Sequence, residues 1–140
     1  MNKKESYTES HKKKNIGKNY DKCMYSKDTW SNRIWQIEKH ILSKILLGKE
    51  NSKIMDFATG TGRIPKFLEK IGFQNITGID SSKSMLKSAR RKLKKTDLLC
   101  LDITNEKDYS KIKGKKFDII LSFRFFLNIE NRLKNIILSR

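Results

Sequence analysis

The sequence predicts an α/β domain built around a mostly parallel sheet, and three observations lead to that class. The length of 140 residues fits one compact domain with a hydrophobic core. Short apolar runs alternate with segments whose apolar residues recur at helical spacing. Strands that alternate with helices along a chain join as parallel neighbours through right-handed crossovers.

The chain divides into a predicted tail and a predicted domain. Residues 1–19 are polar and rich in lysine, with few sizeable apolar side chains, so we expect a flexible basic tail. The folded domain is expected to occupy residues 20–140. Its first helix follows Thr29 and ends near Gly48, and its apolar residues form one stripe: Trp30, Ile34, Ile37, Ile41, Leu42, Ile45 and Leu46.

Four short apolar runs predict the strands, at residues 53–58, 75–80, 97–101 and 117–123. The fourth run is apolar enough to be buried on both faces. Predicted helices follow them: one after Gly62 with Pro65 in its first turn, one capped by Ser81 or Ser82, a weak one at 106–112 and one at 129–138.

A glycine loop, Asp56 to Gly62, connects the first strand to its helix and is the first candidate site. Two glycines at a helix N-terminus bring backbone N–H groups and a positive dipole end close to a ligand. A phosphate-binding P-loop would need G-x-x-x-x-G-K-[ST], which is absent. A dinucleotide fingerprint would need a third small residue where Pro65 stands.

Together with the two strand ends after it, this loop resembles the class I S-adenosylmethionine-dependent methyltransferases. Their first motif is D/E-x-G-x-G-x-G, and Asp56 to Gly62 matches it with Ala58 in place of the first glycine. The resemblance runs from about Tyr20 to the end of the chain and implies a Rossmann-like three-layer sandwich. It also implies an enzyme with S-adenosyl-L-methionine as cofactor. By the match, Asp56 orients the loop or contacts the methionine ammonium group, while Ala58, Gly60 and Gly62 let the backbone approach the cofactor.

Two further strand ends carry the resemblance. Asp80, followed by Ser81, stands where the family has an acidic residue that accepts from both ribose hydroxyls. The resemblance also implies that Met85 packs on the adenine, although packing of its helix in the core would explain this methionine equally well. After the third strand, Asp102 accepts from the adenine amino group and the Ile103 N–H meets a ring nitrogen. An Asp that caps the next helix is the alternative for Asp102.

The end of the fourth strand gives an indication of the molecule that accepts the methyl group. Ser122, Phe123 and Arg124 resemble residues that line the methionine end of the cofactor; the alternative is a buried strand terminus from which Arg124 reaches solvent. The motif [DN]-P-P-[YF], typical of enzymes that methylate amino groups of DNA bases or glutamine amides, is absent. A small-molecule acceptor is therefore favoured. No catalytic base can be named, and the scattered cysteines and histidines predict no metal.

The charge and hydropathy of the chain limit the classes of partner that we expect. The net charge of +17 comes from lysines scattered along the whole chain, which favours a compositional bias and leaves nucleic acid open as a partner. The helix after Asp80 carries a basic face that we interpret as solvated: Lys83, Lys87, Arg90, Arg91 and Lys94. No apolar run of about 18 residues predicts a membrane span. No secretory signal opens the chain, so a cytoplasmic protein is expected.

The family fold usually has seven strands, and only four are predicted here. We therefore expect a C-terminally truncated domain whose fourth strand is an exposed sheet edge. A partner chain or self-association would cover that edge. Two alternatives to a methyltransferase remain: a non-catalytic S-adenosylmethionine-binding fragment, and a basic RNA-binding or RNA methyltransferase module.

Overall fold

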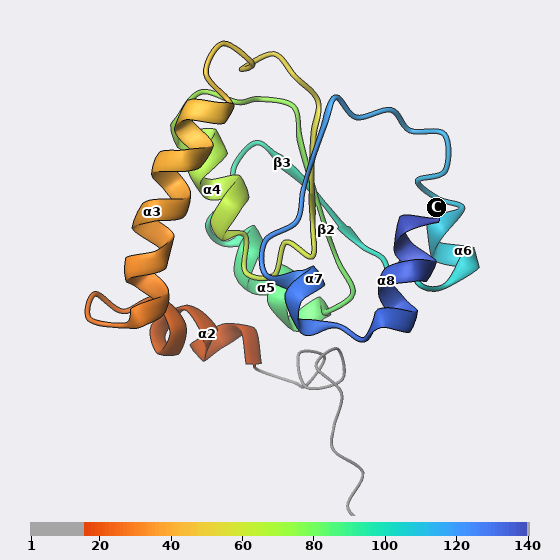
Figure 1. Ribbon diagram of the computed structural model, residues 1–140, viewed down its shortest axis with the longest axis horizontal. Coiled ribbons are helices and arrows are strands. Elements are labelled where there is room, and N and C mark those ends of the chain that lie inside the picture. The colour runs from red at the N-terminus through yellow and green to blue at the C-terminus, as the bar shows by residue number, and fades with distance from the viewer. Residues whose placement is uncertain (1–15, 140) are drawn as a thin grey trace, which may run out of the picture.

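A computed structural model describes residues 16–139, and its centre is a four-stranded sheet in the order β3-β2-β1-β4 (Figure 1). All neighbouring strands run parallel, and Ile54 of β1 pairs with Ile76 of β2 and with Ile119 of β4. The predicted α/β class with a parallel sheet is confirmed. The four strands are β1 (Ile54–Phe57), β2 (Ile76–Asp80), β3 (Thr96–Cys100) and β4 (Ile119–Leu121).

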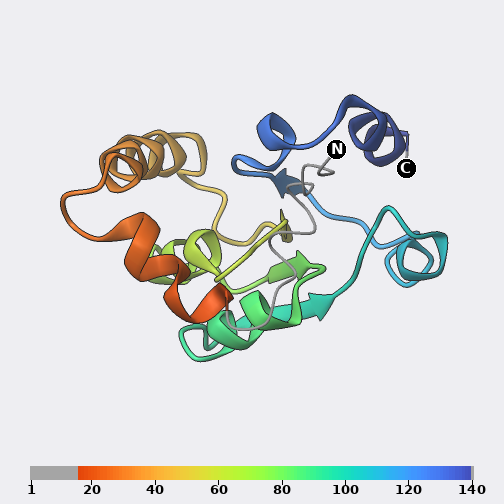
Figure 2. The same ribbon diagram turned by 90° about the horizontal axis from the view of Figure 1, so that it is seen from below.

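Seven helices are described around this sheet, and they cover both of its faces. Their bounds are α2 (Ile16–Tyr25), α3 (Trp30–Ile45), α4 (Arg63–Lys70), α5 (Lys83–Arg90), α6 (Glu106–Tyr109), α7 (Phe125–Asn128) and α8 (Asn131–Leu138). Figure 2 shows α3, α4 and α5 on one side of the sheet and α6 and α8 on the other. Successive β1 residues point to opposite faces, with Ile54 in the first core and Met55 in the second. The result is the predicted three-layer sandwich.

The predicted tail and the predicted helix bounds need adjustment. Residues 1–15 lie outside the described part of the chain, so a tail there stays a prediction. Residues 16–19 belong to α2, which begins four residues before the predicted start of the domain and continues into it. The last predicted helix, at 129–138, corresponds to α8, whereas α7 was not predicted, and α6 is shorter than predicted. Within residues 16–139, no helix combines the length and the hydropathy that a membrane span requires.

The apolar stripe predicted for α3 is only partly buried. Leu42 and Leu46 are buried in the core, and Trp35 packs edge-to-face on Phe67 with ring centroids 5.6 Å apart. Trp30 instead leaves 73% of its surface exposed. Three isoleucines of the predicted stripe are exposed as well: Ile37, Ile41 and Ile45. The helix carries apolar residues on two faces, and only one of them contacts the sheet and α4.

The prediction that the fourth strand is buried on both faces is wrong. Among the described strands β4 pairs with β1 alone, so it forms the edge of the sheet. Ile120 is 62% exposed because nothing in the described part of the chain covers its face of the strand. An apolar run therefore marked a strand correctly without showing how many of its faces are covered.

The packing of α2 on α5 depends on Gly17. A Cβ atom at this position would lie 2.6 Å from the Ser84 carbonyl oxygen and 2.9 Å from the Met85 Cα. Both are backbone atoms, so neither can turn aside as a flexible side chain would. The Gly17 N–H also donates to the Ser84 hydroxyl at 3.3 Å. A side chain here would separate the two helices.

We therefore predict that Gly17→Ala loosens α2 from α5. Overpacking costs about 1–3 kcal/mol, which exceeds the roughly 1 kcal/mol that alanine contributes as a helix former. Denaturant unfolding should show lower stability, and amide exchange should accelerate in α2. Asn19→Ala, an exposed change on the same helix, is the control and should leave exchange unchanged. Equal behaviour of the two variants would contradict the close contact.

Candidate functional site

A cavity of about 400 Å³ opens at the carboxyl ends of the strands, where parallel sheets usually bind ligands. Its wall contains residues from β1 and β2, from the loops that follow the four strands, and from the helices α2, α4, α5 and α7. Most of the residues singled out in the sequence line it: Asp56, Ala58, Gly60, Asp80, Ser81, Met85, Asp102, Ile103 and Phe123. Sites separated by up to 67 residues along the chain therefore share one cavity.

Two of the singled-out residues do not line the cavity. A Cβ at Gly62 would lie 2.8 Å from the Leu93 side chain and 3.0 Å from Ala89, so this glycine permits close packing behind the loop. The Ser122 hydroxyl is buried and finds no hydrogen-bond partner among the described residues. Contacts of these two residues with a ligand remain predictions.

Several lining residues were missed by the sequence analysis. Tyr20 and Met24 reach the cavity from α2, and Arg63 lines it from the start of α4. Helix α2 is held over the loop by Asp21, which accepts from the Thr61 hydroxyl at 2.5 Å and pairs with Lys92. The polar sequence of α2 gave no periodic signal, so a helix was not expected there. Its place over the loop depends on tertiary contacts.

The glycine loop alternates between ordinary and left-handed backbone. The φ angles are +60° at Ala58, +55° at Gly60 and +80° at Gly62. Glycine adopts this region without strain, whereas an L residue at Ala58 does so at an energetic cost. The Thr59 N–H donates to the Ile79 carbonyl at 2.9 Å, which joins the loop to the neighbouring strand.

Asp80 fastens the same loop from the end of β2. One of its carboxylate oxygens accepts from the Gly60 N–H at 2.7 Å, and the other accepts from the Ser82 N–H at 2.8 Å. Ser82 is the N-cap of α5, with its hydroxyl accepting from the Met85 N–H at 3.4 Å. A carboxylate offers about four acceptor positions, so these contacts are compatible with a further ligand.

Asp56 is buried beneath the loop, and its environment is unusual for a carboxylate. The Thr59 hydroxyl donates to Asp56 Oδ2 at 2.6 Å, which ties the end of β1 to the loop. Burial raises the pKa of Asp56 to about 7, although the Thr59 hydrogen bond and the charge of Arg63 oppose the shift; the charge of Asp80 adds to it. Asp56 is therefore partly protonated near neutral pH.

Asp102 forms a tight turn at the end of β3. Its Oδ1 accepts from the Thr104 N–H at 3.1 Å and from the Thr104 hydroxyl at 2.6 Å. The N-cap of α6 is Asn105, whose side chain accepts from the Lys107 N–H at 2.9 Å. The alternative that Asp102 caps this helix is therefore wrong, and its carboxylate remains at the cavity wall.

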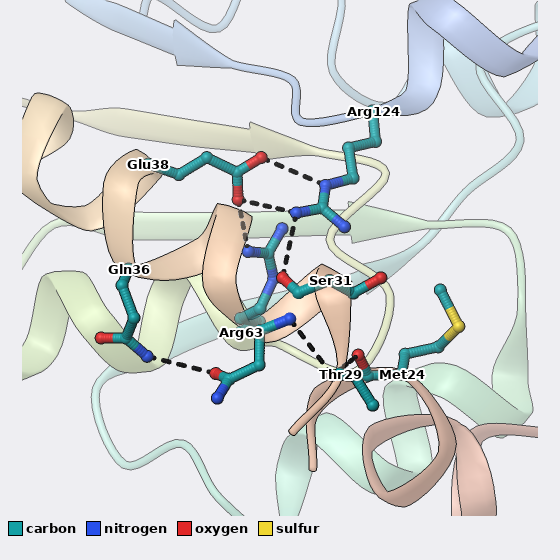
Figure 3. A network of polar contacts seen from close by, with 8 residues as sticks. Met24, Thr29, Ser31, Gln36, Glu38, Arg63 and Arg124 are labelled. Atoms are coloured by element: carbon teal, nitrogen blue, oxygen red, sulfur yellow. Dashed lines mark hydrogen bonds and ion pairs between the residues drawn. The ribbon is translucent and has the colours of Figure 1, made fainter. Parts of the chain in front are cut away.

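A cluster of ion pairs joins two arginines of the cavity wall, Arg63 and Arg124, to Glu38 of α3 (Figure 3). Glu38 of α3 accepts from Arg63 at 2.8 Å and from the Nε and Nη2 atoms of Arg124, each at 3.1 Å. The interpretation that Arg124 reaches solvent is wrong, because its guanidinium turns back to α3. In contrast, the basic residues predicted to form a solvated face on and after α5 are all exposed and outside the cavity wall.

The sequence comparisons agree on one family. The sequence model of the methyltransferase domain matches residues 54–138. Demethylmenaquinone methyltransferase of Thermotoga maritima is 33% identical over 90 residues, which are 64% of this chain and 38% of that protein. The chain thus spans well under half the length of this curated relative.

Solved structures share the fold. The magnesium protoporphyrin IX methyltransferase of Synechocystis PCC 6803 aligns with a TM-score of 0.64 at 14% identity, covering 89% of this chain and 64% of that one. A complex of DhpI with S-adenosylhomocysteine aligns with a TM-score of 0.65 at 17% identity, covering 88% of this chain and 55% of that one. The plantazolicin methyltransferase BpumL aligns with a TM-score of 0.50 at 27% identity, covering 76% of this chain and 39% of that one. At these identities the first two likenesses show the fold alone.

The left-handed Ala58 generates a stability prediction. Ala58→Gly should raise the free energy of unfolding by about 0.5–1 kcal/mol, since relief of left-handed strain exceeds the added freedom of the unfolded chain. Ala89→Gly is the control, because Ala89 lies in α5 and has an ordinary helical backbone. This variant should lower the free energy of unfolding. Urea unfolding measures both. A loss of stability in Ala58→Gly would contradict the strain.

The raised pKa of Asp56 generates a pH prediction. Its native pKa of about 7 lies above the ordinary value of 3.8, so the native state binds more protons than the unfolded state between these values. This group therefore stabilises the fold most below about pH 4 and loses up to about 4 kcal/mol as pH rises through 7. Asp56→Asn removes that dependence while it keeps an acceptor for Thr59. Parallel stability curves against pH for the two proteins would contradict the assignment.

Proposed function

The chain belongs to the methyltransferase domain family, and from that premise we propose that it binds S-adenosylmethionine in the cavity and transfers the methyl group to a small-molecule acceptor. One observation carries the proposal: the glycine loop, Asp80 and Asp102 line one cavity, and Asp80 accepts a hydrogen bond from the loop. The volume of about 400 Å³ lies in the range of small-molecule sites.

The residues present fit the adenosine part of the cofactor at the β2 and β3 ends. Asp80 supplies a carboxylate for the two ribose hydroxyls, and charged acceptors make the stronger hydrogen bonds. Asp102 supplies an acceptor for the exocyclic amine of adenine. Met85 and Ile103 offer apolar surface to the faces of the ring, and both are buried at the cavity wall. Met85 is buried in the core and also lines the cavity, so its contact with the adenine is part of the proposal.

The methionine part would then extend toward β1 and β4. Asp56 fixes the loop through Thr59, and its carboxyl group lies in the wall on this side. Phe123 and the two guanidiniums of Arg63 and Arg124 complete the wall. A guanidinium suits the carboxylate of an amino acid, because both groups are planar and pair through two hydrogen bonds.

The chemistry that the cofactor supplies is an electrophilic methyl group on a sulfonium. Displacement at that carbon uses up the positive charge of the sulfur, so alignment of the acceptor and exclusion of water contribute most of the rate. In this chain Tyr20 and Met24 of α2 would cover the cavity, and Phe123 and Phe125 would line the acceptor side. A general base is required only for an acceptor that is protonated before transfer.

The acceptor class rests on two observations. The names of two relatives, demethylmenaquinone methyltransferase and magnesium protoporphyrin IX methyltransferase, refer to small organic acceptors. The exposed basic residues of α5 lie outside the cavity wall, so they would not bring a nucleic acid to the transferred methyl group. A small molecule is therefore the acceptor class that we propose.

We predict that S-adenosylhomocysteine binds the folded protein in a calorimetric titration and that Asp80→Ala weakens binding. The expected loss is about 1.5–3 kcal/mol, the contribution of hydrogen bonds to a charged group. Asp97→Ala is the matched control, because Asp97 is exposed on β3 and outside the cavity wall.

Absence of binding to folded wild-type protein would overturn the proposed cofactor. Unchanged affinity of the Asp80 variant would overturn only the ribose assignment. Transfer of a labelled methyl group from S-adenosylmethionine to small organic acceptors then tests catalysis separately from binding.

A further inference from the structure

Two arginines that line the cavity, Arg63 and Arg124, contact the same carboxylate, that of Glu38 (Figure 3). Arg63 Nη1 donates to Glu38 Oε2 at 2.8 Å, and Arg124 donates to both Glu38 oxygens at 3.1 Å. The three residues come from α3, from the first position of α4 and from the turn after β4. Glu38 lies outside the region that the family sequence model matches.

The cluster is sheltered from solvent, so its charges act at short range with limited screening. Side-chain exposure is 15% for Arg63, 17% for Glu38 and 25% for Arg124. Burial by itself raises the pKa of Glu38, but hydrogen bonds from Arg124 and Arg63 outweigh it and hold the pKa below its usual value. Glu38 is thus an anion between two cations, and the cluster carries a net charge of about +1.

Arg124 has an unusual backbone conformation, and its side chain is held by contacts with α3. Its φ of 63° and ψ of −4° are left-handed, a conformation that non-glycine residues adopt at some cost. Arg124 is the N-cap of α7 without a side-chain hydrogen bond to that helix. Its guanidinium instead points back to α3, where Nη2 also lies 3.5 Å from the Ser31 carbonyl oxygen. The two-point contact with Glu38 therefore sets the direction of the side chain.

We propose that Glu38 is a positioning residue that fixes Arg63 and Arg124 at the cavity wall and supplies the negative charge that lets a sulfonium bind beside them. The inference rests on the proposed function. Two guanidiniums without a counter-charge would attract the carboxylate of the methionine part and repel the positive sulfur. With Glu38 ionised, one positive charge remains for the carboxylate, and the repulsion of the sulfonium is reduced.

The test uses two ligands that differ in charge at one atom. S-adenosylmethionine carries a sulfonium, whereas S-adenosylhomocysteine has a neutral thioether; both have the same carboxylate and ammonium groups. Glu38→Gln should lower the affinity for S-adenosylmethionine relative to S-adenosylhomocysteine by roughly three- to tenfold, as expected for one charge in a partly screened site. A purely structural role of Glu38 would weaken both ligands equally and leave the ratio unchanged.

The matched control is Glu69→Gln. Glu69 is also a carboxylate with several hydrogen bonds, to the Lys94 and Lys95 N–H groups and to the Thr96 hydroxyl, and it lies outside the cavity wall. The change removes the same charge from the protein, so it corrects for the effect of net charge. The ratio of the two affinities should stay within about twofold of the wild-type ratio, because Glu69 is only half-buried and lies outside the cavity wall, so its charge is screened.

Arg124→Gln provides the opposite test, because it removes a cation and should shift the ratio toward S-adenosylmethionine. The double variant Glu38→Gln with Arg124→Gln restores the balance of charges and should return the ratio of the two affinities to near the wild-type value.

If Glu38→Gln alone does not fold, the direction in which Arg124→Gln changes the affinity ratio decides the question. A ratio that does not move in any folded variant overturns the proposal. Failure of the wild type to bind either ligand overturns the proposed function instead.

Discussion

The cavity depends first on the carboxylate of Asp80, which ties two segments to the end of β2. Its hydrogen bonds to the Gly60 and Ser82 N–H groups hold the glycine loop and the start of α5 in place. Without that link, the left-handed backbone at Ala58 and Gly60 would lack support on one side. The buried bond between Asp56 and Thr59 supports the loop from the other strand. One side chain thus shapes the loop and also stands where the ribose is proposed to bind.

Charge is distributed unevenly around the same cavity. The ends of β1, β2 and β3 contribute carboxylates, whereas the side next to β4 contributes two guanidiniums with Glu38 between them. The proposed cofactor has a matching asymmetry, since its hydroxyls and amines need acceptors and its carboxylate needs donors. The surface charge of the chain is a separate matter, because the exposed lysines and arginines of α5 do not line the cavity.

Local patterns predicted the parts of the site that follow strands. Asp56, Asp80 and Asp102 come directly at or after strand ends, and parallel strands bring such ends to one edge of a sheet, so their meeting could be expected from the sequence. Residues that approach from elsewhere could not be predicted in this way. Tyr20 lies in a polar segment, and although Glu38 is the one acidic residue of α3, no local pattern links it to two arginines. Only contacts across the fold bring Tyr20 to the cavity and Glu38 to the arginines that line it.

The amino-acid pattern was sufficient for the class of the fold, the four strands and the glycine loop, because hydrophobic periodicity and turn residues act over a few neighbouring positions. It did not select which apolar face of α3 is buried, nor show that Ile120 is exposed, because both outcomes depend on what packs against the element. The direction of Arg124 was likewise decided by Glu38, 86 residues earlier in the chain. Contacts between distant segments follow from the assembled layers, and no local pattern contains that information.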